Sequence, residues 1–250
     1  MTVSQSEVVQ PHTRLLRIGL AEPESREYWR QSQRPLGDRR AEVAFEERWF
    51  GSRALVRVQY LINSFQARFD AYPQALKALH RWNPDDLGER RLLCHWHLQL
   101  SDPLYRDFSG SHLPQRMQHP QPTLDRNAVL RWVEQAGGGR WSAATAQRMA
   151  AGLMGVLNEV GYTSGTAALR PISLPRVTDR SLAYLMYLLR HTEFQGTLND
   201  NPYLESVGID KNALEARLMR LPGIRFQKMS DLKELHFDHA DLWEWTCHLP

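Results

Sequence analysis

The chain has 250 residues, of which 42% are apolar and 24% charged, and its formal net charge is +3. This length and apolar content suit one large or two modest folded domains and exclude an intrinsically disordered chain. There is no apolar run of membrane-spanning length, no signal-peptide pattern at the start, and only two well-separated cysteines, Cys94 and Cys247. We therefore expect a cytoplasmic protein without disulfides.

The positive charge is carried mostly by arginine and is uneven along the chain. Residues 1–140 hold 20 basic and 16 acidic side chains, whereas residues 141–250 hold 11 and 12. The arginine fork suits phosphate groups and guanine edges, which is compatible with nucleic-acid binding. A GC-rich genome produces the same bias, so composition alone leaves the partner open.

Residues 1–11 are expected to form a flexible terminus, followed by an all-helical domain over residues 12–122. Its clearest helix starts at Ser52 as N-cap and ends at Phe69. The apolar residues of this helix recur at helical spacing and comprise Leu55, Val58, Leu61, Ile62, Phe65 and Phe69. This pattern predicts a helix with one face in the core.

The opposite face of the same helix carries Arg53, Arg57 and Arg68. These arginines either form a DNA-facing stripe or belong to a solvated face that is paired with nearby carboxylates. The candidate carboxylates are Glu46, Glu47 and Asp70. The positive balance of this half of the chain favours the DNA-facing interpretation.

Residues 123–250 are expected to form a winged-helix region, with two winged-helix-like units over 123–180 and 181–250. In the first unit, Ser142 is the predicted N-cap of a helix that ends at Gly161. The proline-containing stretch Leu169–Val177 follows and predicts an edge hairpin, or wing. A helix followed by a small hairpin is the order in which winged-helix domains meet DNA.

The second unit repeats this order after an apolar, buried helix over residues 181–191. A short helix over 201–207, a turn at Gly208 and an N-cap at Asp210 precede a helix over 211–221. Residues 224–227 and 234–237 then alternate polar and apolar around Ser230 and Asp231, which is typical of a hairpin. The predicted fold class is therefore mainly α, with short β-hairpins.

Three segments resemble BrxA proteins of the BREX phage-defence systems. They are Ser52–Phe69, which continues into Asp-Ala-Tyr-Pro, then Arg91–Leu100, and the run from Trp141 to Tyr162. The resemblance covers roughly residues 12–240. It implies an N-terminal domain similar to the NusB fold, a C-terminal winged helix and binding of double-stranded DNA beside other BREX proteins. The chain lacks the family's usual glycine-containing first segment and is longer at its C-terminal end, which would make it a divergent member.

Two helices of the winged-helix region supply further DNA-binding candidates. Ser142, Thr145 and Arg148 occupy the first turns of one helix, where the helix dipole favours phosphate, although its many apolar residues also suit a packing helix. The other helix presents a polar face that also contains the repelling Glu215. The candidates on that face are Lys211, Asn212, Arg217 and Arg220.

Catalytic and metal sites are not expected. Helical spacing places Leu93, Trp96 and Leu100 inward and spreads the run from Cys94 to His97 around the helix, so structural histidines are favoured over a zinc site. Nucleotide-binding and hydrolase motifs are missing from the sequence. We thus expect no enzyme, cofactor, metal or small-molecule substrate. Two functions stay open: double-stranded DNA binding, and protein docking by an adaptor whose winged helices are structural.

Overall fold

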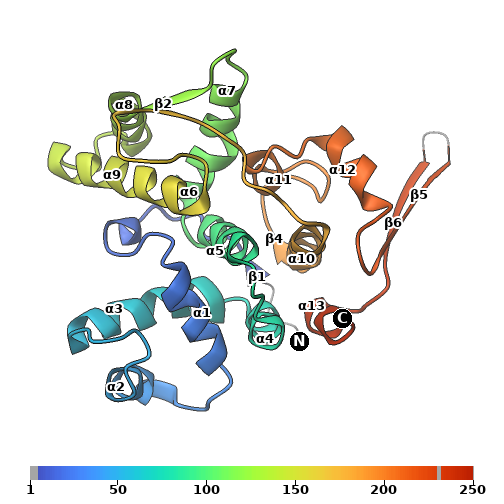
Figure 1. Ribbon diagram of the computed structural model, residues 1–250, viewed down its shortest axis with the longest axis horizontal. Coiled ribbons are helices and arrows are strands. Elements are labelled where there is room, and N and C mark those ends of the chain that lie inside the picture. The colour runs from blue at the N-terminus through green and yellow to red at the C-terminus, as the bar shows by residue number, and fades with distance from the viewer. Residues whose placement is uncertain (1–4, 230–231, 250) are drawn as a thin grey trace.

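The computed structural model describes residues 5–229 and 232–249 and is mainly helical, which confirms the predicted fold class (Figure 1). The α-helices are α1 Glu22–Gln31, α2 Arg40–Glu46, α3 Leu55–Phe65, α4 Pro73–Trp82, α5 Leu87–Ser101, α6 Pro103–Asp107, α7 Leu113–Met117, α8 Arg126–Gly137, α9 Ala143–Val160, α10 Asp179–Arg190, α11 Pro202–Ser206, α12 Lys211–Leu218 and α13 Leu242–Cys247. The strands are β1 Gln5–Ser6, β2 Thr123–Asp125, β3 Leu169–Pro171, β4 Thr192–Glu193, β5 Ile224–Met229 and β6 Leu232–Phe237.

Helix α5 lies at the centre of the molecule, with the other helices arranged around it (Figure 1). Asp86 caps its N-terminus by accepting the N–H of Glu89, and every residue from Leu92 to Ser101 is buried. Helix α5 is therefore buried on all sides rather than on one face. The expected inward placement of Leu93, Trp96 and Leu100 is confirmed, but Cys94, His95 and His97 are equally buried.

Helices α1 to α4 lie on one side of α5 (Figure 1), where α1 and the turn after α3 contact it, and aromatic rings form much of the core there. The apolar stripe of α3 is buried except at Leu55, which is 44% exposed. The predicted N-cap at Ser52 is wrong. Gly51 makes a turn with φ +74°, and the N-cap is Ala54, two residues after Ser52, so the helix begins at Leu55. Beyond Phe65 the chain continues as a π-helical turn over Gln66–Asp70.

The first predicted winged-helix unit, over residues 123–180, ends two residues earlier, because Thr178 caps α10; we call residues 123–178 unit A, and it consists of β2, α8, α9 and β3. The predicted cap at Ser142 and helix end at Gly161 are confirmed, with Gly161 at φ +103°. The predicted hairpin within Leu169–Val177 is wrong. Instead, β3 pairs antiparallel with β2, so that the two strands close the ends of the α8–α9 pair. Pro171 and Pro175 lack the N–H groups that a second ladder would require.

The second unit, which we call unit B (residues 179–249), runs α10, β4, α11, α12, β5, β6, α13. The expected buried helix is α10, and Asp210 caps α12 as predicted by accepting the N–H of Ala213. The predicted hairpin is confirmed as the antiparallel ribbon β5–β6, which extends away from the body (Figure 1). Residues 230 and 231 of its expected turn lie outside the described residues.

The expectation that residues 1–11 are loose is wrong for residues 5–8, while residues 1–4 lie outside the described part. Strand β1 pairs in parallel with β4, 187 residues further along the chain at the register Gln5 to Thr192. A single cluster of buried apolar residues also runs from Leu15 to Trp245. The predicted boundary at residue 122 therefore divides two sets of elements that share one core.

Candidate nucleic-acid interface

The three arginines predicted on the helix after Ser52 do not form an exposed stripe. Arg68 is 3% exposed and donates to the carbonyl oxygens of Leu20 and Gly19 at 2.8 and 2.9 Å. Arg57 donates to the carbonyl oxygen of Arg17 at 2.7 Å. Arg68 is therefore a structural residue that closes the segment before α1, because its five donors satisfy carbonyls that would otherwise be buried without partners.

Arg53 is exposed, but its guanidinium pairs with Glu24 at 2.8 Å. The alternative of a solvated face paired with carboxylates therefore holds for Arg53 alone, and its partner is Glu24 rather than Glu46, Glu47 or Asp70. Glu47 pairs with Arg34, and Asp70 pairs with Arg40. Arg34, Arg40 and Arg53 are therefore neutralised locally, whereas Arg14 and Arg48 are exposed and belong to no ion pair among the described residues.

The candidates on α12 are divided in the same way. Lys211 and Asn212 are exposed at its first turn. Arg217 donates to Asp179 at 2.5 Å and to the carbonyl oxygen of Val177 at 3.0 Å, and Arg220 lies 4.0 Å from the same carboxylate. Because a shared carboxylate neutralises part of both guanidinium charges, this helix presents less positive charge than its sequence suggests.

The candidates on α9 lie at an exposed helix start. Ser142 Oγ accepts the N–H of Thr145 at 3.3 Å and lies 3.0 Å from Thr145 Oγ1, so both hydroxyls serve the cap. Arg148 is exposed and belongs to no ion pair within residues 5–229 and 232–249. Helices α9 and α12 lie on opposite sides of α5 (Figure 1), so the predicted residues form separate surfaces.

Unit A combines an excess of arginine over acidic residues with a lack of arginine ion pairs in the part of the chain that the structure describes. It holds six arginines and three acidic residues, and none of the six belongs to an ion pair among the described residues. Five of them are exposed and Arg170 is half-buried. The six are Arg126, Arg131, Arg140, Arg148, Arg170 and Arg176. Arg126 and Arg170 were not among the sequence-predicted candidates.

Arg126 and Arg170 meet at an open groove of about 440 Å³ beside α9. Its other lining includes Ala151 and Gly155 from the exposed face of α9 and the amide side chain of Asn158. No carboxylate lines this groove. Small side chains allow close approach of a ligand. Arg170 uses Nε to bind the carbonyl oxygen of Ala167 at 2.8 Å, which leaves its two terminal nitrogens, together with the Arg126 guanidinium, as donors for phosphate oxygens.

The local folding of unit A explains how the groove forms. Asp125 ends β2 and caps α8 by accepting the N–H groups of Asn127 and Ala128, which places Arg126 at the first position of the helix. The N–H of Arg126 donates to the carbonyl oxygen of Ala168, next to β3. The β2–β3 pairing therefore brings Arg126 and Arg170 together from positions 44 residues apart in the sequence.

The one acidic residue of α9 points away from the groove. The Glu159 carboxylate accepts a hydrogen bond from the Ala21 backbone, and burial raises the pKa of this carboxyl. It lies against Gly19 in the segment before α1. The exposed face of α9 toward the groove consequently presents Gln147, Arg148 and small residues without an opposing negative charge.

The cluster from Cys94 to His97 is a structural core. His95 contacts the hydroxyls of Tyr105 and Ser206 at 2.6 and 3.0 Å, and His97 contacts that of Tyr184 at 2.7 Å. Burial lowers the pKa of both imidazoles to about 3, so both are neutral. Within the described residues, no group of three or more His, Cys, Asp or Glu side chains is arranged to hold a metal ion.

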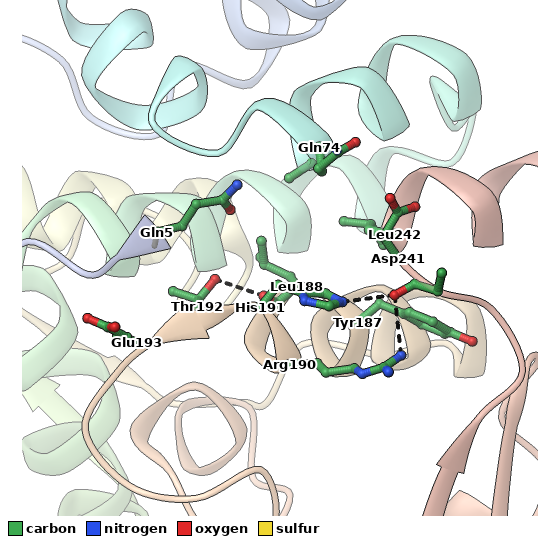
Figure 2. A pocket seen from close by; sticks show the side chains of 12 residues that line it. Gln5, Gln74, Tyr187, Leu188, Arg190, His191, Thr192, Glu193, Asp241 and Leu242 are labelled. Carbon is green, nitrogen blue, oxygen red and sulfur yellow. Dashed lines mark hydrogen bonds between the residues drawn. The ribbon is translucent and has the colours of Figure 1, made fainter. Parts of the chain in front are cut away.

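A second cavity, of about 520 Å³, lies between α4, α10, the start of α13 and β1 (Figure 2). Arg190 and His191 point along its wall, but they hydrogen-bond to the backbone carbonyls of His239 and Ala240 at 3.0 Å. Asp241 and Glu193 add acidic groups to the same lining. With charges of both signs and donors already engaged, this cavity is a poorer phosphate site than the groove beside α9.

Comparison with known proteins supports the fold and leaves the family open. No family model and no curated protein matches the sequence. A crystal structure described as an uncharacterized protein from Magnetospirillum magneticum is similar, with a TM-score of 0.58 and 18% identity over 72% of this chain and 97% of that chain. At this identity the likeness concerns the fold alone. Among the described helices, none has the length and apolar character to cross a membrane.

Proposed function

We propose that the protein binds double-stranded DNA through unit A, as a non-catalytic component of a BREX-type bacterial defence system. The observation that carries the DNA-binding part is the groove beside α9, where two arginines and small residues come together without a carboxylate. The BREX part rests on the resemblance of the Ser52–Phe69, Arg91–Leu100 and Trp141–Tyr162 segments to BrxA proteins.

The composition of the α9 face supports contact with the DNA backbone more than reading of bases. Arg126, Arg148 and Arg170 supply donors for phosphate oxygens, which carry no sequence information. The N-terminus of α9 adds the positive end of an 18-residue helix. Ala144, Ala151 and Gly155 cannot hydrogen-bond to base edges, so we expect binding that tolerates many sequences.

Titration of a fluorescent duplex of about 30 base pairs, followed by anisotropy at several salt concentrations, tests this function. Each phosphate contact contributes a slope of about −0.9 in the plot of log affinity against log salt. Four to six contacts from unit A would therefore give a slope of about −4 to −5. Failure to form a complex at low salt would rule the function out.

A second function, protein docking by an adaptor subunit, is favoured by unit B. This unit holds 8 basic and 11 acidic residues, and three of its five arginines, at 217, 220 and 225, lie beside carboxylates. Met219 at the end of α12 is 79% exposed. A neutral to acidic surface with an exposed apolar side chain suits a protein partner better than a phosphate backbone.

A further inference from the structure

Residues 5–8, which we call the strap, cross between the N-terminal helices and unit B. The pairing of β1 with β4 continues in a hydrogen bond from the N–H of Glu7 to the carbonyl oxygen of Glu193 at 3.0 Å. The next N–H, that of Val8, donates to the carbonyl oxygen of Leu100 in α5 at 2.8 Å. Successive backbone groups of one short segment thus bind the two parts of the molecule in turn.

The Glu7 side chain is surrounded by donors from unit B and α6. Its carboxylate accepts the Tyr203 hydroxyl of α11 and the N–H of Gln195, and it lies 3.4 Å from Nε of Arg106. Glu7 is only 8% exposed. A buried carboxylate is tolerated when it is paired and hydrogen-bonded, so this carboxylate depends on partners from both sides of the junction.

The strap is also fixed from the side of the N-terminal helices. The Tyr72 hydroxyl, at the start of α4, donates to the carbonyl oxygen of Ser6 at 2.9 Å. Arg106 donates through one nitrogen to the carbonyl of Val8 at 2.9 Å and through another to that of Gln99 at 2.7 Å. Arg106 is therefore bound to α5 and the strap at once.

Direct strand pairing between β4 and the β5–β6 ribbon does not occur within the described residues. Strand β1 is consequently the strand partner of β4, and β4 leads through a short loop to α11 and α12. On its other side, Gln5 of the strap borders the 520 Å³ cavity together with Thr192 and Leu188 (Figure 2). The junction thus combines a short strand pair, one buried carboxylate and an adjoining cavity.

We infer that the strap is a conformational device that locks the β4–α11–α12 segment of unit B against the N-terminal helices. Release of the strap loosens this segment first, while helices α8 and α9 of unit A keep their own packing; unit A meets the segment from its other side, where the Tyr162 hydroxyl donates to the carbonyl oxygen of Ser206. Any partner that bound β4 or the strap itself would shift this equilibrium, because a ligand favours the state to which it binds more tightly. The inference does not depend on DNA binding.

Hydrogen exchange followed by mass spectrometry on Glu7→Ala and Glu7→Gln tests the inference. Loss of the carboxylate should speed exchange in residues 192–218 by about tenfold for Glu7→Ala, because local opening there becomes easier, and by less for Glu7→Gln. Exchange in α8 and α9 should stay within about twofold of the original protein, since local opening is confined to one segment.

The matched control is Glu42→Gln, which removes an exposed carboxylate that lies 3.7 Å from Arg39 in α2. It should leave exchange unchanged everywhere. Equal acceleration in α9 and in residues 192–218, or no acceleration in either, would overturn the inference. If Glu7→Ala does not fold, Glu7→Gln decides the question, because it keeps the size of the side chain but removes the charge and turns one acceptor oxygen into an NH2 donor.

Discussion

Units A and B both contain a helix, a turn and a second helix, but they differ in how many of their arginines lie beside carboxylates. Unit A holds six arginines with three acidic residues, and none of the six is in an ion pair among the described residues. In unit B, three of the five arginines are paired, Arg217 and Arg220 with Asp179 and Arg225 with Asp238, whereas Arg180 and Arg190 belong to no ion pair among the described residues. A similar order of elements can therefore carry different surface charge, because the placement of carboxylates sets how many arginines are left unpaired.

The largest expected effect is a loss of stability at low pH, and it concerns His95, which contacts both units, and its neighbour His97. His95 lies between Ser206 of unit B, at 3.0 Å, and Tyr162 of unit A, at 3.3 Å. Burial lowers the pKa of His95 and His97 to about 3, below the value of about 6.5 in an unfolded chain. The unfolded chain therefore binds more protons between these values, and stability falls as pH falls through this window.

Each histidine approaches a cost of about 1.4 kcal/mol per pH unit below pH 6, so the change from pH 6.5 to 5 should cost about 3 kcal/mol for both. Urea unfolding at a series of pH values measures this loss, and hydrogen exchange in α9 and α12 follows each unit. Above pH 6.5 the two histidines should make stability independent of pH. A stability that does not change between pH 6.5 and 5 would contradict the burial of neutral His95 and His97.

The next largest effect on stability comes from glycines in the turns before α9 of unit A and α12 of unit B. Gly208 has φ +71°, and a Cβ there would lie 2.3 Å from Leu174 Cδ1. Gly138 has φ +54° with open space around its Cβ position. Gly208→Ala should cost about 2–3 kcal/mol from strain and overlap, and Gly138→Ala about 1 kcal/mol from strain alone. Thermal unfolding of the two variants checks this order, and equal losses would show that Leu174 yields without cost.

The smallest expected effect on stability separates paired from unpaired arginines. Arg217→Ala removes the donor to the Val177 carbonyl and to Asp179, both in a partly buried setting. It should lower the free energy of unfolding by about 1–2 kcal/mol. Arg148→Ala removes an exposed side chain without an ion pair and should change stability by less than about 0.5 kcal/mol. Chemical denaturation compares them. A larger loss for Arg148→Ala would mean that its guanidinium has a structural role.

The helical framework could be predicted from the sequence because it depends on local signals. The caps at Ser142 and Asp210, the end at Gly161 and the alternation in the β5–β6 ribbon each lie within a few residues of the element they define. The cap at Ser52 was wrong because Gly51 turns the chain and delays the start of α3. In this chain, local patterns predict the type of each element more reliably than its first residue.

The charge pattern could not be predicted because it depends on contacts between distant segments. Arg68 finds its carbonyl partners 48 and 49 residues away, and Arg217 finds Asp179 at a distance of 38. The groove arises only when β2 pairs with β3 and brings Arg126 to Arg170. The excess of arginine in unit A, six arginines against three acidic residues over positions 123–178, is present in the sequence. The groove that brings two of these arginines together is not.

The most direct test of the account is a comparison of charge reversal in the two units. Arg126→Glu with Arg148→Glu in unit A, and Lys211→Glu with Arg220→Glu in unit B, change the net charge equally at exposed positions. Their affinities for the same duplex of about 30 base pairs should be measured by anisotropy at fixed salt. The account predicts a loss of about 100-fold and a salt slope reduced by about 2 for the unit A variant, and a change within about threefold for the unit B variant. Equal losses, or a larger loss from unit B, would contradict it.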